Sequence, residues 1–147
     1  MQFKEFFEGQ QITLGPTLVT KEAILSFATQ WDPQWFHTDE ERAGEHLFGG
    51  LIASGWHTCC MAMRLVADNI LKGSESFASP GIDKLRWLQP VRPGDELTVH
   101  LLVREVRRSA SRPELGILRW DWRVDNQHGQ TVLTADVTSM FRLPVDA

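Results

Sequence analysis

Residues 56–71 of the chain read WHTCCMAMRLVADNIL, and their apolar side chains cover nearly every side of the helix that this stretch predicts. A helix of this kind is usually buried at the centre of a structure rather than laid on its surface. The stretch is too short for a membrane span, and His57, Arg64 and Asp68 interrupt it. We therefore expect a central helix that other elements surround.

The residues after this helix alternate between apolar and polar side chains, as half-buried strands do. The alternation predicts strands that include residues 97–103, 118–124 and 131–143, with turns at 90–95 and 125–129. A further strand is expected near the N-terminus, at Gln11 to Val19. One long helix and about five antiparallel strands give an α+β fold in which the sheet wraps around the helix.

A second helix is predicted before the central one, from the N-cap Thr20 to Trp31. Pro33 disfavours its continuation through Asp32. Acidic residues after Thr38 resemble the first turn of another short helix. The second helix carries an apolar stripe at helical spacing, which predicts one buried face formed by Ile24, Phe27, Ala28 and Trp31.

Asp32 and His37 lie five residues apart where the second helix ends, among aromatic side chains. A carboxylate that accepts a proton from water and an imidazole that donates one are the minimum for proton-transfer chemistry. Apolar surroundings move the pKa of both groups toward useful values. By itself the same spacing also describes a helix end followed by a surface turn, with His37 an incidental neighbour.

The 147 residues, 42% of them hydrophobic, predict one globular domain over residues 1–147. The net charge is −4 and the basic residues are interleaved with acids, so nucleic acid is a poor candidate partner. We see no signal peptide or membrane span and expect a cytoplasmic protein. The adjacent Cys59 and Cys60 indicate neither a disulfide framework nor a zinc site.

Two groups of polar residues have more than one interpretation. The first group consists of Arg104, Arg107, Arg108 and Arg112. These arginines either form the solvated end of a hairpin or contact the anionic tail of a cofactor. In the second group, His57 is expected to be a hydrogen-bonded interior or interface residue, and His46 to lie on a loop over the site. Neither histidine has metal-ligand spacing with a partner, so no metal is expected.

Three motifs occur in a specific order along the chain. Asp32 and His37 are the first, Ile-Ala-Ser-Gly-Trp at residues 52–56 is the second, and Pro-Val-x-Pro-Gly-Asp-x-Leu at residues 90–97 is the third. In this order and spacing they resemble the MaoC-like dehydratases, hot-dog-fold proteins that include the R-specific enoyl-CoA hydratases. The resemblance spans residues 11–143.

The resemblance implies a hydratase or dehydratase that adds water to a trans-2-enoyl-CoA or removes it from an R-3-hydroxyacyl-CoA. Asp32 would accept a proton from water, His37 would hold that water and help to protonate C2, and the Gly55 N–H would face the thioester oxygen. Coenzyme A is then part of the substrate, and no separate cofactor is expected. Further residues are expected to contact a compact acyl end of the substrate: Trp35, Phe36, Phe48, Ser54 and Trp56.

Two departures from the family pattern stand near these residues. Ser54 occupies a position where the family commonly has histidine. Met63 occupies the position, two helical turns after Gly55, at which characterised hydratases carry a serine that braces the catalytic aspartate. Asp32 then needs another hydrogen-bond donor, or its basicity and orientation change.

The resemblance also implies assembly, because hot-dog domains pair their sheets edge to edge and an isolated domain leaves strand edges exposed. A homodimer or a higher even oligomer is expected. Two other functions remain open. Hot-dog thioesterases cleave acyl thioesters with a carboxylate on or near the central helix, where this chain has none in the early turns. A subunit that binds acyl-CoA without catalysis is the other alternative.

Overall fold

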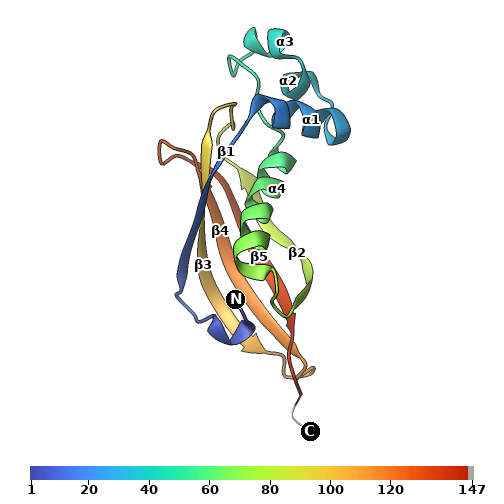
Figure 1. The fold of residues 1–147 in the computed structure, drawn as a ribbon, viewed down its shortest axis with the longest axis vertical. Coiled ribbons are helices and arrows are strands. Elements are labelled where there is room, and N and C mark those ends of the chain that lie inside the picture. Colours follow the sequence, from blue (N-terminus) through green and yellow to red (C-terminus); the bar gives the residue numbers. More distant parts are fainter. Residues whose placement is uncertain (146–147) are drawn as a thin grey trace.

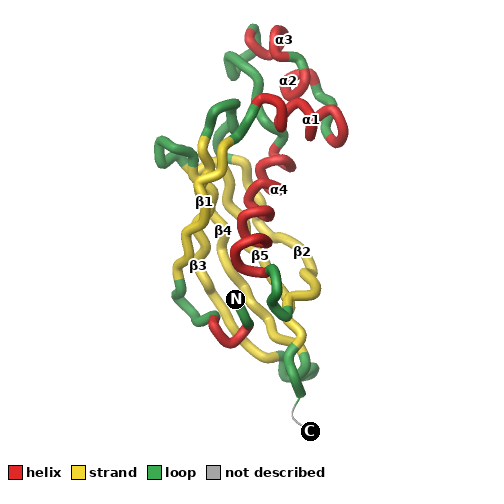
Figure 2. Tube along the Cα trace, in the orientation of Figure 1, coloured by secondary structure: helices red, strands yellow, loops and turns green. Residues whose placement is uncertain are grey.

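The computed structural model describes residues 1–145 and shows an antiparallel sheet curled around one central helix (Figures 1 and 2). The strand order is β1-β3-β4-β5-β2, so β1 and β2 form the two edges. The predicted α+β class is confirmed. The strands are β1 (Gln11–Leu18), β2 (Ser76–Trp87), β3 (Glu96–Arg108), β4 (Leu115–Asp125) and β5 (Thr131–Arg142).

The central helix α4 (Gly55–Val66) runs along the concave face of the sheet and continues into a π-helical segment, η2 (Ala67–Leu71). Together they cover the helix predicted from the sequence to within one residue. The short helices gather beyond the N-terminal end of α4 (Figure 1). They are α1 (Lys21–Trp31), α2 (Trp35–Thr38) and α3 (Glu40–Gly44), while η1 (Phe3–Glu5) lies near the N-terminus.

Alternation along the strands decides which face of the sheet meets α4. In β4 the even-numbered positions from Leu118 to Val124 are buried, and Arg119 and Arg123 between them are exposed. The odd-numbered positions from Leu97 to Val103 on β3 are buried in the same way. Because successive side chains of a strand point to opposite faces, the apolar set forms the core and the charged set forms the outer face. The alternation predicted from the sequence is therefore confirmed.

The sequence pattern does not locate β2, although about five strands are expected. Its sequence, SFASPGIDKLRW, contains Pro80 and Gly81, which normally weaken a strand. Both residues are tolerated because β2 lies at the edge of the sheet and pairs only with β5. That pairing contains three register shifts. Most of its side chains are exposed in the single chain.

The structure corrects two expectations about burial. Trp31 is 68% exposed, because the buried stripe of α1 ends at Ala28, three residues before the helix itself ends. In α4 the side that faces the sheet is buried, but one sheet covers only one side of a helix. Trp56, Cys60 and Met63 on the other side are exposed in the single chain.

No helix within residues 1–145 combines the length and the apolar composition that crossing a lipid bilayer requires.

Replacing Leu118 by alanine should lower the free energy of unfolding by about 2–5 kcal/mol, since it removes a fully buried side chain from the core and leaves a cavity. Leu18 is 60% exposed on β1, and the same replacement there should cost less than about 1 kcal/mol. Urea unfolding at one fixed protein concentration measures both values. Equal losses in the two variants would contradict the assigned core.

Candidate active site

The chain brings Asp32 and His37 together by a sharp turn between two helices. Asp32 caps the C-terminal end of α1, Pro33 follows it, and the chain enters α2 with His37 in the third position. The His37 Nε2 atom lies 3.3 Å from Asp32 Oδ2. Both side chains are largely shielded from solvent, with 6% of the His37 side chain and 16% of the Asp32 side chain exposed.

The orientation of the His37 ring is fixed by its other nitrogen. Nδ1 lies 2.7 Å from the carbonyl oxygen of Ile52. Because a carbonyl oxygen can only accept, Nδ1 is the atom that carries the hydrogen in this contact. Nε2, which faces Asp32, is then the nitrogen that can gain or lose a proton.

Both oxygens of Asp32 accept hydrogen bonds. The Ser54 hydroxyl donates to Oδ2 at 2.7 Å, and the Gln34 side-chain amide donates to Oδ1 at 2.7 Å. We expected Ser54 to contact the substrate. Ser54 is instead fully buried and lies behind Asp32. It supplies the donor that Met63 cannot. Met63 points elsewhere and is 42% exposed.

The surroundings of Asp32 change its pKa in opposing directions. Burial raises the pKa of the carboxyl group, but the Ser54 and Gln34 hydrogen bonds and the nearby His37 ring lower it by more. The net result is a pKa below the ordinary value, so Asp32 is a carboxylate at neutral pH.

The three sequence motifs meet at this point. The Ile52 carbonyl holds His37 and the Ser54 hydroxyl holds Asp32, which joins the second motif to the first. The Ala53 N–H donates to the Val91 carbonyl at 2.8 Å, which joins the second motif to the third. Their order along the sequence therefore reflects one compact structural unit.

The helix α4 begins at Gly55, directly after these contacts. Since the first N–H groups of a helix have no acceptor within it, this end can bind a developing negative charge. The Trp87 indole N–H donates to the Gly55 carbonyl at 2.9 Å. A β-carbon built on Gly55 would lie only 2.4 Å from the Trp87 ring, so any other residue here would require that ring to move. The sequence pattern did not identify Trp87, because it belongs to the edge strand that the pattern did not locate.

A cavity of about 260 Å³, hereafter the site cavity, opens beside His37, whereas Asp32 lies behind His37 and is not among the residues that line it. His37, Phe48 and Gly55 of the predicted residues line it. Its other lining residues include Thr58, Trp87 and Val91.

The remaining expected contacts lie outside the site cavity. Phe36 packs edge-on against the His37 ring at 4.3 Å. Trp35 packs against His46 at 4.7 Å and beneath the Arg42 guanidinium, and Trp56 lines a neighbouring apolar groove.

Comparison with known proteins finds a family whose matched residues include all three motifs. Residues 6–117 match the model of the MaoC-like domain. The chain belongs to this family. The uncharacterized protein YdeM of Bacillus subtilis is 35% identical over 142 residues, which is 97% of this chain and 99% of YdeM.

Two solved structures share the fold of this MaoC-like domain. The MaoC-like dehydratase of Rhodospirillum rubrum is 38% identical, with a TM-score of 0.87 over 97% of each chain. The R-hydratase PhaJ1 of Pseudomonas aeruginosa is 23% identical, with a TM-score of 0.78 over 99% of this chain and 90% of that one. The predicted hot-dog fold is confirmed.

The other two histidines of interest lie near the MaoC-like site without joining the pair. His57 is buried as expected and stacks on Phe27 at 4.8 Å, but its Nδ1 atom has no hydrogen-bond partner within the described residues. Burial lowers the pKa of His57. His46 packs between Trp35 and Phe48. Residues 1–145 contain no cluster of three or more potential metal ligands.

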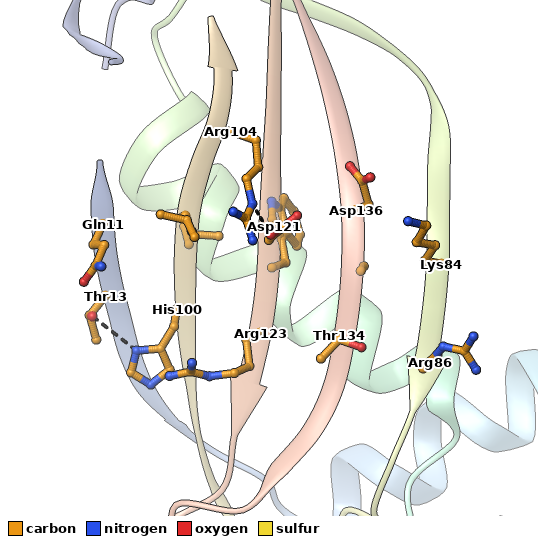
Figure 3. A pocket seen from close by; sticks show the side chains of 14 residues that line it. Gln11, Thr13, Lys84, Arg86, His100, Arg104, Asp121, Arg123, Thr134 and Asp136 are labelled. Atoms are coloured by element: carbon orange, nitrogen blue, oxygen red, sulfur yellow. Dashed lines mark hydrogen bonds and ion pairs between the residues drawn. The ribbon is translucent and has the colours of Figure 1, made fainter. Parts of the chain in front are cut away.

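A larger groove of about 580 Å³ lies on the outer face of the sheet, with α4 behind it (Figure 3). None of the three motifs lines it. One ion pair in it crosses strands, between Arg104 of β3 and Asp121 of β4. Beyond this groove, Arg107 pairs with Glu105, and Arg108 donates to the Pro113 carbonyl within the β3–β4 hairpin. These contacts favour the interpretation of the arginines as a hairpin end.

Replacing Ser54 by alanine should raise the pKa of Asp32 relative to the wild-type protein, because the lowering hydrogen bond is lost. The free energy of unfolding at pH 7 should fall by about 1–3 kcal/mol. NMR titration of the Asp32 carboxyl carbon and urea unfolding measure the two effects. Ser26→Ala on the exposed side of α1 is the matched control.

The sign of the pH dependence follows from the lowered pKa. A carboxylate whose folded-state pKa is depressed stabilises the fold above its unfolded pKa, and this contribution disappears as the pH falls through the folded value. The stability gap between the wild-type protein and Ser54→Ala should therefore narrow in acid. An Asp32 titration that is identical in both proteins would show that the hydroxyl does not act on the carboxylate.

Proposed function

We propose that this MaoC-like domain is an acyl-thioester hydratase or dehydratase, which adds water to a trans-2-enoyl-CoA or removes it from an R-3-hydroxyacyl-CoA. The observation that carries the proposal is the 3.3 Å contact between Asp32 and His37, of which His37 lines the site cavity together with Gly55, the first residue of α4. Family membership and the likeness to an R-hydratase support the same reaction class.

Asp32 is the base in this proposal. It accepts a proton from a water molecule while the oxygen of that water forms a bond to C3 of the substrate. The lowered pKa keeps Asp32 ionised at neutral pH, and the hydrogen bonds from Ser54 and Gln34 fix its orientation. An oriented base reduces the entropy lost on reaching the transition state.

The electrons of the C2–C3 double bond move toward the thioester as the C3–O bond forms. The carbonyl oxygen then carries the negative charge of an enolate. In the proposal this oxygen faces the free N–H of Gly55 at the positive end of α4. One such donor stabilises the transition state by about 3 kcal/mol.

Protonated His37 donates its Nε2 proton to C2, which completes the addition of water. The site then holds neutral His37 and protonated Asp32, and the proton returns from Asp32 Oδ2 to Nε2 across their 3.3 Å contact. The Ile52 carbonyl keeps Nε2 directed at this exchange throughout. The water that Asp32 deprotonates and the proton that His37 donates lie on the same side of the substrate. The hydroxyl group and the hydrogen therefore add to the same face of the double bond.

Absorbance of the enoyl-thioester band with crotonyl-CoA, measured beside a free-thiol assay, tests the reaction class. Loss of the band without thiol release is the expected result, with an R-3-hydroxyacyl product. Thiol release would assign the protein to the thioesterases. Binding of acyl-CoA with neither signal would assign it to the non-catalytic subunits.

Replacing Asp32 by asparagine should lower kcat for hydration by a factor of about 10² or more, since the near-isosteric amide cannot accept the proton. Asp68→Asn, at an exposed ion pair with Arg64 on α4, is the matched control and should leave kcat unchanged. Steady-state kinetics and circular dichroism measure activity and folding. A kcat within a few-fold of wild type in Asp32→Asn would remove Asp32 from the mechanism.

We also propose that the domain works as a homodimer or higher even oligomer. The exposed side of α4 carries Trp56 and Met63, and β2 is an unpaired edge strand within the described part of the chain. A second copy that pairs with β2 would satisfy the edge and cover the exposed parts of Trp56 and Met63, which would turn the groove between α4 and the sheet into an enclosed channel.

Replacing Ile82, which is 51% exposed on β2, by aspartate should shift the protein toward monomer by placing a charge in the proposed interface. Phe7→Asp, at a 61% exposed position outside α4 and β2, is the control and should not change assembly. Sedimentation velocity over a concentration series gives the mass of each species. Assembly of Ile82→Asp that equals wild type would place the interface elsewhere.

A further inference from the structure

Trp87 lines one cavity and contacts Trp56, which lines another. On one side is the site cavity of about 260 Å³, which Trp87 itself lines together with Gly55. On the other side is a larger groove of about 510 Å³ between α4 and the sheet, hereafter the apolar groove. The lining of the apolar groove is mostly hydrophobic and includes Trp56, Cys59, Met63, Leu85, Leu133 and Val137.

The indole of Trp87 is held from two directions. Its N–H donates to the Gly55 carbonyl at 2.9 Å, on the side of the site cavity. Its ring meets the ring of Trp56 edge to face at 5.3 Å, on the side of the apolar groove. The absence of a side chain at Gly55 lets the ring approach the helix closely. The two indoles, hereafter the wall, are therefore in contact, and one belongs to a residue that lines the site cavity and the other to a residue that lines the apolar groove.

The size of the site cavity limits what fits on its side of the wall. A volume of about 260 Å³ corresponds to roughly nine water molecules at ~30 Å³ each. The reacting water, the thioester and the first carbons of the acyl chain must share this space. The apolar groove is almost twice as large, and its mostly hydrophobic lining suits the further carbons of a long chain.

We propose that Trp87 determines the acyl-chain length of the substrate by closing the site cavity against the apolar groove. A chain of four carbons ends before the wall, and a chain of eight carbons meets the indole. This inference rests on the proposed hydratase function for its substrate class. It adds that the natural acyl group is short, and that removing the Trp87 ring opens a path for longer chains.

Two variants separate the bulk of the ring from its hydrogen bond. Trp87→Ala removes both, while Trp87→Phe keeps most of the bulk and loses the bond to the Gly55 carbonyl. A purely structural role for Trp87 would lower activity on all chain lengths equally. Selection by bulk changes the ratio between chain lengths in Trp87→Ala and preserves it in Trp87→Phe.

The experiment measures kcat/KM for four-carbon and eight-carbon trans-2-enoyl-CoA in the full-length wild type and both variants. Wild type should prefer the four-carbon substrate. In Trp87→Ala the ratio of eight-carbon to four-carbon kcat/KM should rise by at least about tenfold, a modest share of what four buried methylenes can contribute. In Trp87→Phe the ratio should remain within about threefold of wild type.

Binding of saturated butyryl-CoA and octanoyl-CoA, measured by calorimetry, gives a readout that needs no chemistry. The affinity ratio should shift toward octanoyl-CoA in Trp87→Ala and stay constant in Trp87→Phe. If no enoyl-CoA is turned over but the affinity ratio shifts toward octanoyl-CoA in Trp87→Ala, the hydratase proposal is overturned. The proposal that Trp87 limits the acyl-chain length is then supported.

An unchanged ratio in Trp87→Ala, or a wild type that uses and binds both lengths equally, would overturn the wall. The wild-type comparison decides the question even if Trp87→Ala fails to fold.

Discussion

The apolar face of a five-stranded sheet has to be covered, and in this chain α4 is the element that covers its concave side. The buried positions of β3, β4 and β5 pack around Ala62, Val66 and Ile70 of the central helical segment. Removal of this apolar surface from water is the main driving force for folding. The helix therefore lies on the concave side of the curved sheet, where it covers that surface. The N-terminal end of α4 is thereby fixed in space, and the candidate site is assembled around that end.

The residues just before α4 connect this constraint to the chemistry. Ile52 orients His37 through its carbonyl, Ser54 binds Asp32 through its hydroxyl, and Gly55 begins the helix. One short segment therefore sets the position of the proposed base, the proposed acid and the proposed oxyanion donor relative to one another. All three groups are therefore bound to, or part of, the same short piece of backbone, which fixes their positions relative to one another.

The sequence predicts those features that depend on periodicity or on local spacing. Alternation located β3 to β5, and the apolar run located α4, because burial of one face imposes a period on the chain. β2 was not predicted because most of its side chains are exposed, so they show no alternation, and because Pro80 and Gly81 interrupt the strand. Ser54 was expected at the substrate surface, and only the tertiary packing of the Asp32 turn against the start of α4 shows it bound to the carboxylate. Trp31 followed the helical period and yet is exposed, since periodicity gives no information about where a neighbouring element ends.

The close approach of Trp87 to Gly55 has a consequence for how this chain can vary. Any side chain at position 55 would overlap the indole where it now lies, so a mutation there requires the Trp87 ring to move or the residue at position 87 to become smaller. Conversely, a small residue at position 87 leaves a gap against the helix that a methyl group at position 55 could fill. The two positions are therefore epistatic, and variation at one should accompany variation at the other.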